Sequence, residues 1–200
     1  MSRRGFLQQS VLTTASTTLG ALPLIAASQE AAAASAGARP IAGADRLSIA
    51  LMINGSERTL EVEPRATLVE VLRGPLALRG TKIGCNRGAC SACTVWLDGA
   101  PVCACMLLAV DVGHRQVTTI EGLGSPDQLH PVQAAFVEHD AVQCGFCTPG
   151  MVMSCAALVR DRPSATAEEV RQAISGHLCR CGTYPHAVEA TVAVLAGPKT

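Results

Sequence analysis

The stretch from Gly84 to Gly99 reads GCNRGACSACTVWLDG and decides how the first part of the chain folds. Its three cysteines, together with Cys105, have the spacing C-x4-C-x2-C-x11-C. Because three thiols lie so close in sequence, one loop must wrap around whatever they bind. Gly80, Gly84 and Gly88 would allow that loop positive φ angles and close backbone approach. The TVWL segment predicts a strand, and Asp98-Gly99 predicts a hairpin turn.

Four thiolates at this spacing indicate a 2Fe–2S cluster held as in plant-type ferredoxins, by Cys85, Cys90, Cys93 and Cys105. Backbone N–H groups of the loop can point at the sulfur atoms and help to set the reduction potential. The fourth ligand would fix the loop to the sheet. Cys103 stands two residues before Cys105 and competes with it for that role.

Alternating and turn-forming residues on both sides of this loop predict a small mixed, β-rich domain over residues 46–122. Thr67 and Glu70 make a capping box that predicts a short helix, ended by Gly74-Pro75. Asn54-Gly55 predicts a hairpin turn. The expected strands are Leu47–Ile53, Thr59–Val62, Thr94–Leu97 and Val117–Ile120, and the expected helix is Thr67–Arg73.

Residues 121–126 (EGLGSP) mark a boundary between domains. The second domain is expected to cover residues 123–200, where the sequence pattern is helical. Three of the expected helices carry proline at the first position, where its missing N–H costs nothing. The other has Thr166 and Glu169 as a capping box, with Gly176 just past its end. The expected helices are Pro131–Val142, Pro149–Arg160, Ala167–Ser175 and Pro185–Leu195. Short linkers between them predict a compact four-helix domain.

A second set of cysteines lies in this helical region: Cys144, Cys147, Cys179 and Cys181, with the spacing C-x2-C-x31-C-x1-C. The first pair precedes a helix, where the dipole and free N–H groups favour thiolate. Two helix pairs would bring two ligands each to the centre of the bundle. On spacing alone, structural zinc and an iron–sulfur cluster suit these four thiols equally well.

Composition excludes several functions. Net charge is zero, without a basic run after residue 36, which argues against nucleic acid and anionic membranes as main partners. Aromatic residues are only 2% of the chain, so Ala, Val and Leu must build the core, and Trp96 is expected there.

No catalytic triad, phosphate loop or dinucleotide fingerprint is present in the sequence, and no catalytic residue is assigned. The five histidines show no metal-site spacing, and Cys155 is expected to be a buried apolar residue.

The first 36 residues have the order of an export signal. Arg3 and Arg4 precede a diluted apolar stretch and A-x-A sites, and the pattern resembles a twin-arginine signal rather than an Ala-rich tail. Residues 37–45 then form a linker. Twin-arginine export carries folded, cofactor-loaded proteins, so the expected location is the periplasm. The apolar stretch is short for a membrane span, and none is expected in the mature chain.

Three segments together resemble the small subunits of the xanthine oxidase family of molybdenum hydroxylases. They are QCGFCTPG from Gln143, CRCG from Cys179, and the upstream GCNRGACSACTVWLDG. With the leader and the EGLGSP segment, the chain is most similar to the iron–sulfur subunit of periplasmic aldehyde oxidoreductases. The resemblance implies an α+β fold: an N-terminal β-grasp ferredoxin-like domain, then a C-terminal four-helix-bundle 2Fe–2S domain. It also favours iron–sulfur over zinc for the second set, and the family's register favours Cys105 over Cys103.

The resemblance further implies an electron-transfer role with no substrate chemistry on this chain. Electrons would pass from a molybdopterin centre on a large partner subunit through the helical-domain cluster and the ferredoxin-type cluster to FAD on another subunit. Gln143 would hydrogen-bond the pterin, Cys179 or Cys181 would lie nearest to it, and the Cys85 loop would face the flavin. Arg180 would tune the cluster potential or meet a partner carboxylate. The alternatives are a free-standing exported ferredoxin, a small subunit of an N-heterocycle hydroxylase, and a structural protein stapled by zinc or disulfides.

Overall fold

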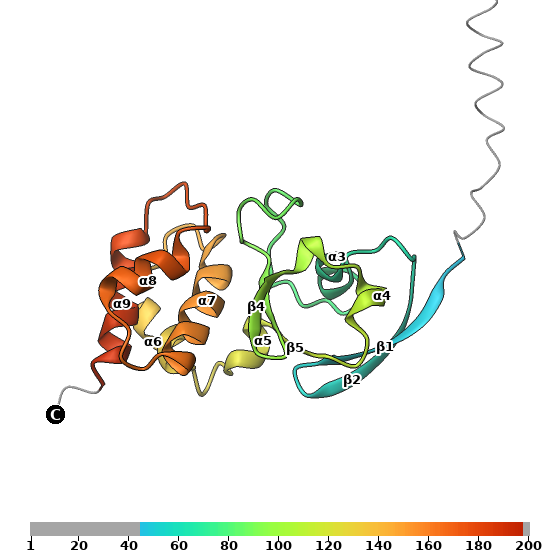
Figure 1. Ribbon diagram of the computed structural model, residues 1–200, viewed down its shortest axis with the longest axis horizontal. Coiled ribbons are helices and arrows are strands. Elements are labelled where there is room, and N and C mark those ends of the chain that lie inside the picture. Colours follow the sequence, from blue (N-terminus) through green and yellow to red (C-terminus); the bar gives the residue numbers. More distant parts are fainter. Residues whose placement is uncertain (1–44, 198–200) are drawn as a thin grey trace, which may run out of the picture. The chain divides into compact units, whose positions relative to one another are not determined.

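The computed structural model describes residues 45–197, so the expected export signal and nearly all of the expected linker lie outside the described residues. Two hydrophobic cores organise the described part. One fills the region around the sheet, here called the sheet half (residues 45–119), and the other fills the helical half (residues 120–197) (Figure 1). The predicted α+β fold class is confirmed.

The sheet half contains a five-stranded mixed sheet with the order β2-β1-β5-β3-β4. Its strands are β1 (Leu47–Ile53), β2 (Ser56–Val62), β3 (Thr94–Leu97), β4 (Ala100–Cys103) and β5 (Gln116–Thr118). β1 pairs antiparallel with β2 and parallel with β5, and β3 pairs antiparallel with both β4 and β5. The two hairpin turns were predicted correctly: Asn54, Gly55, Asp98 and Gly99 all have φ between 50° and 84°.

Helix α3 (Leu68–Arg73) supplies the apolar side chains that cover the sheet. Leu68, Val69, Val71 and Leu72 are at most 2% exposed and pack with Leu51, Val95 and Val117. The Thr67–Glu70 capping box is present, because the Thr67 N–H donates to the Glu70 carboxylate at 2.8 Å. Helix α3 packed on a mixed sheet is the β-grasp arrangement that the family resemblance implied.

The helical half consists of four helices around its own core, with α6 (Pro131–Glu138), α7 (Thr148–Asp161), α8 (Ala167–Ile174) and α9 (Tyr184–Leu195). Small residues dominate that core, as the composition requires, and Cys155 is fully buried in it. None of the helices among residues 45–197 is long and apolar enough to cross a membrane.

Several boundaries differ from expectation. β2 begins at Ser56, three residues before the expected Thr59. α6 ends at Glu138, four residues early, because Asp140 takes a φ of 51° that an α-helix cannot contain. The expected strand to Ile120 stops at Thr118, and the one-turn helix α5 (Ile120–Leu123) follows. Two further short helices, η1 (Ala104–Met106) and α4 (Ala109–Val112), connect β4 to β5.

Trp96 joins the two halves. It lies on β3, yet its ring belongs to the core of the helical half, and its indole N–H donates to the Met153 carbonyl of α7 at 2.9 Å. The Arg160 guanidinium covers the same ring at 4.6 Å from its centre and donates to the Gly99 carbonyl at 2.9 Å. The expected core role of Trp96 is confirmed, in the core of the other half.

Candidate metal centres

The first set of cysteines (Cys85, Cys90, Cys93 and Cys105) lies in the loop between α3 and β3 and in η1. Backbone amides of the loop point at its sulfur atoms. The N–H groups of Arg87 and Ala89 donate to Cys85 Sγ at 3.4 and 3.2 Å, and that of Gly88 donates to Cys105 Sγ at 3.2 Å. The Cys85 N–H donates to Cys90 Sγ at 3.4 Å. Such a cradle of amide donors stabilises negative charge on sulfur.

The glycines of this loop act in two different ways. Gly88 has a φ of 75°, as expected, while Asn86 and Ser91 adopt positive φ without being glycine. Gly84 instead permits close approach, because a Cβ there would lie 2.9 Å from Cys90 Sγ. A Cβ on Gly80 would lie 2.3 Å from Ile120 Cγ2. The expectation of positive φ at all three glycines was therefore wrong for Gly80 and Gly84, where close packing is the constraint.

The thiols of the first set group in pairs. The Cys85 thiol lies beside that of Cys90, and the Cys93 thiol lies beside that of Cys105. The backbone N–H of Arg87, together with other donors of the loop, lowers the pKa of Cys85 to about 7. Burial raises the pKa of Cys93 to about 12. Two pairs of thiols match two irons, each of which needs two cysteine ligands in a 2Fe–2S centre.

Cys105 and Cys103 have different surroundings. Cys105 is 6% exposed and accepts the Gly88 amide from inside the loop. Cys103 ends β4, and its thiol faces the Ser91 hydroxyl at 3.9 Å. Of these two thiols, only that of Cys105 accepts a hydrogen bond from a backbone N–H of the loop. This difference supports Cys105 as the fourth ligand.

The second set (Cys144, Cys147, Cys179 and Cys181) also groups in pairs, Cys147 with Cys179 and Cys144 with Cys181. Each pair joins the segment before α7 to the segment before α9. Cys147 is the N-cap of α7 and is 6% exposed, whereas Cys144 is exposed to solvent. The expectation that these thiols meet at the centre of the bundle was wrong: they lie at the end where α7 and α9 begin (Figure 1).

The helix start does not lower the pKa of Cys147 as expected. Burial raises it to about 12, because a thiolate loses its hydration there, and the neighbouring Cys179 side chain acts in the same direction. Burial also raises the pKa of Cys179. Hydrogen bonds from the hydroxyl and the backbone N–H of Thr183 lower it by more, and the pKa is about 7. The Thr183 hydroxyl lies 3.4 Å from Cys179 Sγ. The side chain that favours thiolate in this set therefore comes from the start of α9, which the sequence analysis missed.

The donor set fits 2Fe–2S clusters. In the described range, no three His, Cys, Asp or Glu side chains converge on a position for one metal ion. The thiols of each set lie in two pairs, and a two-iron centre needs two cysteine ligands for each iron. The eight cysteines predicted from spacing are the residues that would hold two such clusters, and their role as ligands stays a prediction. Each cluster, when bound, would accept and release one electron.

Other candidates have ordinary surroundings. Gln143 is exposed beside Cys144, and Arg180 is exposed between Cys179 and Cys181. His130 caps α6 by accepting from the Val132 N–H, and His186 contacts the His139 carbonyl. His177 differs because it is buried, and burial lowers its pKa to about 4.

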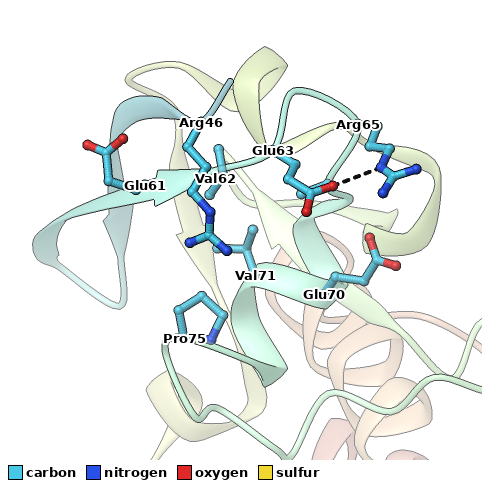
Figure 2. A pocket seen from close by; sticks show the side chains of 9 residues that line it. Arg46, Glu61, Val62, Glu63, Arg65, Glu70, Val71 and Pro75 are labelled. Atoms are coloured by element: carbon cyan, nitrogen blue, oxygen red, sulfur yellow. Dashed lines mark hydrogen bonds and ion pairs between the residues drawn. The ribbon is translucent and has the colours of Figure 1, made fainter. Parts of the chain in front are cut away.

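A surface hollow of about 710 Å³ lies in the sheet half, beside β2 and α3 (Figure 2). Its lining includes the positively charged Arg46 and the negatively charged Glu61 and Glu70. Arg65 and Glu63, also in the lining, form an ion pair at 2.8 Å (Figure 2). No cysteine lines it. The hollow therefore has no part in holding either thiol set.

Comparison with known proteins assigns both halves. Residues 51–121 match the family model of the 2Fe–2S iron–sulfur cluster binding domain, and residues 119–192 match that of a 2Fe–2S binding domain. The aldehyde oxidoreductase iron–sulfur-binding subunit PaoA of Escherichia coli (strain K12) is 40% identical over 205 residues, covering 95% of this chain and 86% of PaoA. The chain belongs to the iron–sulfur subunits of the xanthine oxidase family of molybdenum hydroxylases.

Other members of the family act on different substrates. The small subunit of nicotine 6-hydroxylase from Paenarthrobacter nicotinovorans is 47% identical over 148 residues, covering 74% of this chain and 89% of that subunit. Among solved structures, quinoline 2-oxidoreductase from Pseudomonas putida 86 matches with a TM-score of 0.73 and 40% identity over 76% of this chain and 93% of that one. The predicted two-domain order is that of the family.

Proposed function

We propose that this iron–sulfur subunit relays electrons through two 2Fe–2S clusters, one held by each thiol set. A single contact supports the relay most directly. The backbone N–H of Leu178 donates to the Cys90 carbonyl at 3.2 Å. Cys90 belongs to the first set, and Leu178 precedes Cys179 of the second. A hydrogen bond therefore links the peptide of one ligand to the neighbour of another.

Close packing strengthens this contact. Gly150, in the first turn of α7, has no side chain to hold the sheet half away: a Cβ there would lie 2.4 Å from the Ser91 carbonyl oxygen. A Cβ on Gly84 would likewise lie 3.7 Å from Cε1 of Phe146, so the Phe146 ring lies against the loop of the first set. The two ligand loops thus contact each other through backbone and small residues, and short separation is what electron transfer requires.

The outer side of the second set suits a partner subunit. Val142, Phe146 and Leu178, each within two residues in sequence of a thiol of the second set, are 40%, 48% and 62% exposed, and Cys144 is exposed as well. Apolar side chains grouped at a redox site favour a protein partner. We assign this side to the large molybdopterin subunit, where Gln143 would reach the pterin. The loop of the first set would face an FAD subunit.

Aldehyde oxidation is the proposed reaction of the whole enzyme, with N-heterocycle hydroxylation as the second candidate. The similarity to PaoA covers 95% of the chain and so reaches into the N-terminal segment before residue 45. The similarity to the nicotine 6-hydroxylase small subunit covers 74%. Arg3-Arg4, followed by a diluted apolar stretch and A-x-A sites, supports export by the twin-arginine route to the periplasm.

Co-purification tests the proposal. The full chain, tagged at its C-terminus and expressed with its neighbouring reading frames, should retain a large molybdenum-containing subunit and contain about four irons per copy of this chain. The isolated complex should oxidise an aldehyde faster than nicotinate with an artificial acceptor. A lone iron-containing monomer would favour a free-standing ferredoxin, and a colourless zinc protein would contradict any redox role.

A further inference from the structure

A tyrosine at the start of α9 closes the loop that carries Cys179. The phenol oxygen of Tyr184 lies 2.7 Å from the Cys179 nitrogen and 2.8 Å from the His177 carbonyl oxygen. A backbone N–H can only donate and a carbonyl oxygen can only accept. The single phenol proton therefore goes to His177, and the phenol oxygen accepts the amide proton of Cys179.

The same loop has other anchors. His177 is 3% exposed, and its Nε2 lies 2.8 Å from the Ser154 hydroxyl of α7. The Thr183 hydroxyl lies 3.4 Å from Cys179 Sγ. Since α7 and Thr183 already fix the loop, loss of the phenol need not release it. The distinct effect of Tyr184 is on the direction of one amide.

That effect opposes what happens in the first set. There, the amides of Arg87, Gly88 and Ala89 all donate to cysteine sulfurs. An N–H directed at sulfur stabilises the more negative, reduced form of a cluster and raises its reduction potential. In the second set, the backbone N–H groups of Gly182 and Thr183 are directed at Cys179 Sγ, but the phenol occupies the amide of Cys179 itself, so that this one donor is not directed at sulfur.

We propose that Tyr184 is a positioning residue that holds the Cys179 amide away from sulfur and so keeps the potential of the second cluster below that of the first. The proposal rests on the proposed relay. It gives the relay a direction, because an electron moves spontaneously from the centre of lower potential to that of higher potential. The residue does this without contacting substrate.

Tyr184→Phe in the full chain, with both clusters loaded, tests the proposal. The freed amide should turn towards sulfur, and the reduced-to-oxidised ratio of the second cluster at a fixed potential should rise roughly threefold or more. The paramagnetic signal of that cluster should change shape, while the first cluster stays unchanged as an internal reference. Thr191→Val is the matched control: it removes a buried hydroxyl from the same helix, bonded to the Ala187 carbonyl at 2.7 Å, and should shift neither cluster.

A second measurement covers the case in which the Phe variant loses the second cluster. Tyr184 is the only tyrosine of the chain, so growth on fluorotyrosine alters this subunit at one position. A fluorinated phenol is a weaker acceptor, and the potential should rise in the same direction by less. Unchanged potentials and signals in the fluorinated chain would overturn the role of Tyr184. Absence of two clusters from the unmodified chain would instead contradict the proposed function.

Discussion

The two thiol sets place similar ligands in different environments. In the first set Cys90, Cys93 and Cys105 are at most 9% exposed, and loop amides donate to the sulfurs. In the second set Cys144 is exposed, and the side chains of Thr183 and Tyr184 arrange the loop of Cys179. The first environment protects a cluster and favours its reduced form. The second environment leaves the side of Cys144 exposed to solvent. A centre that receives electrons from another subunit requires such an accessible side.

The largest expected effect distinguishes the ligands themselves. Cys105→Ser should abolish the first cluster and leave the second, because serine at this buried position removes a thiolate that accepts the Gly88 amide. Cys103→Ser should spare both clusters, since this thiol faces the Ser91 hydroxyl. Iron content and the visible spectrum of both variants check this. Loss of a cluster in Cys103→Ser and retention in Cys105→Ser would reverse the assignment.

Exposure predicts the order in which the clusters are lost. In the isolated full chain, a chelator under mild oxidation should remove the second cluster first, because Cys144 is exposed while three ligands of the first set are buried. Time-resolved spectra of the two paramagnetic signals measure the order. Docking of the large subunit should slow loss of the second cluster. Faster loss of the first cluster would show that exposure does not govern the difference.

Trp96→Phe should weaken the junction of the halves by a moderate amount. It removes the indole N–H donated to Met153 and weakens the contact with Arg160. A neutral hydrogen bond and an exposed cation–π contact are together worth about 1–2 kcal/mol. Chemical denaturation of the loaded chain measures the loss. In a double-mutant cycle, Arg160→Ala should cost less in the Trp96→Phe background, and strict additivity would contradict the coupling.

The smallest effect concerns the two capping boxes, one in each half. The Thr67 backbone N–H lowers the pKa of Glu70, and that of Thr166 lowers the pKa of Glu169. A depressed folded-state pKa gives stability that is present above the unfolded value near 4.5 and is lost as the pH falls through the folded value. Glu70→Gln and Glu169→Gln should each flatten the acid side of the stability profile slightly. Unchanged profiles for both would contradict the capping role.

Much of the fold could be predicted from local patterns. The β1 strand was predicted with its observed bounds. Thr67, Thr166 and the three helix-starting prolines marked, to within one residue, where five helices begin. β4 was not predicted, because Ala100-Pro101-Val102-Cys103 contains a proline. A proline is tolerated there since β4 is one of the two edge strands of the sheet.

The eight candidate ligands could be predicted from spacing, but their environments could not. Pairing of Cys144 with Cys181 depends on how α7 and α9 pack, which no local pattern determines. Burial of Cys147 likewise follows from tertiary packing and reverses the pKa shift expected from the helix start. Tyr184 and Thr183 follow directly after the CRCG segment, so their proximity to Cys179 was the available signal.

Reductive titration of the native full chain, followed by electron paramagnetic resonance, tests the relay most directly. We predict two distinct one-electron signals of equal final intensity, with the first-set cluster reduced at the higher potential. Cys105→Ser and Cys147→Ser should each remove a different one of them. One signal at full reduction, from protein with a full iron content, would contradict a two-cluster relay.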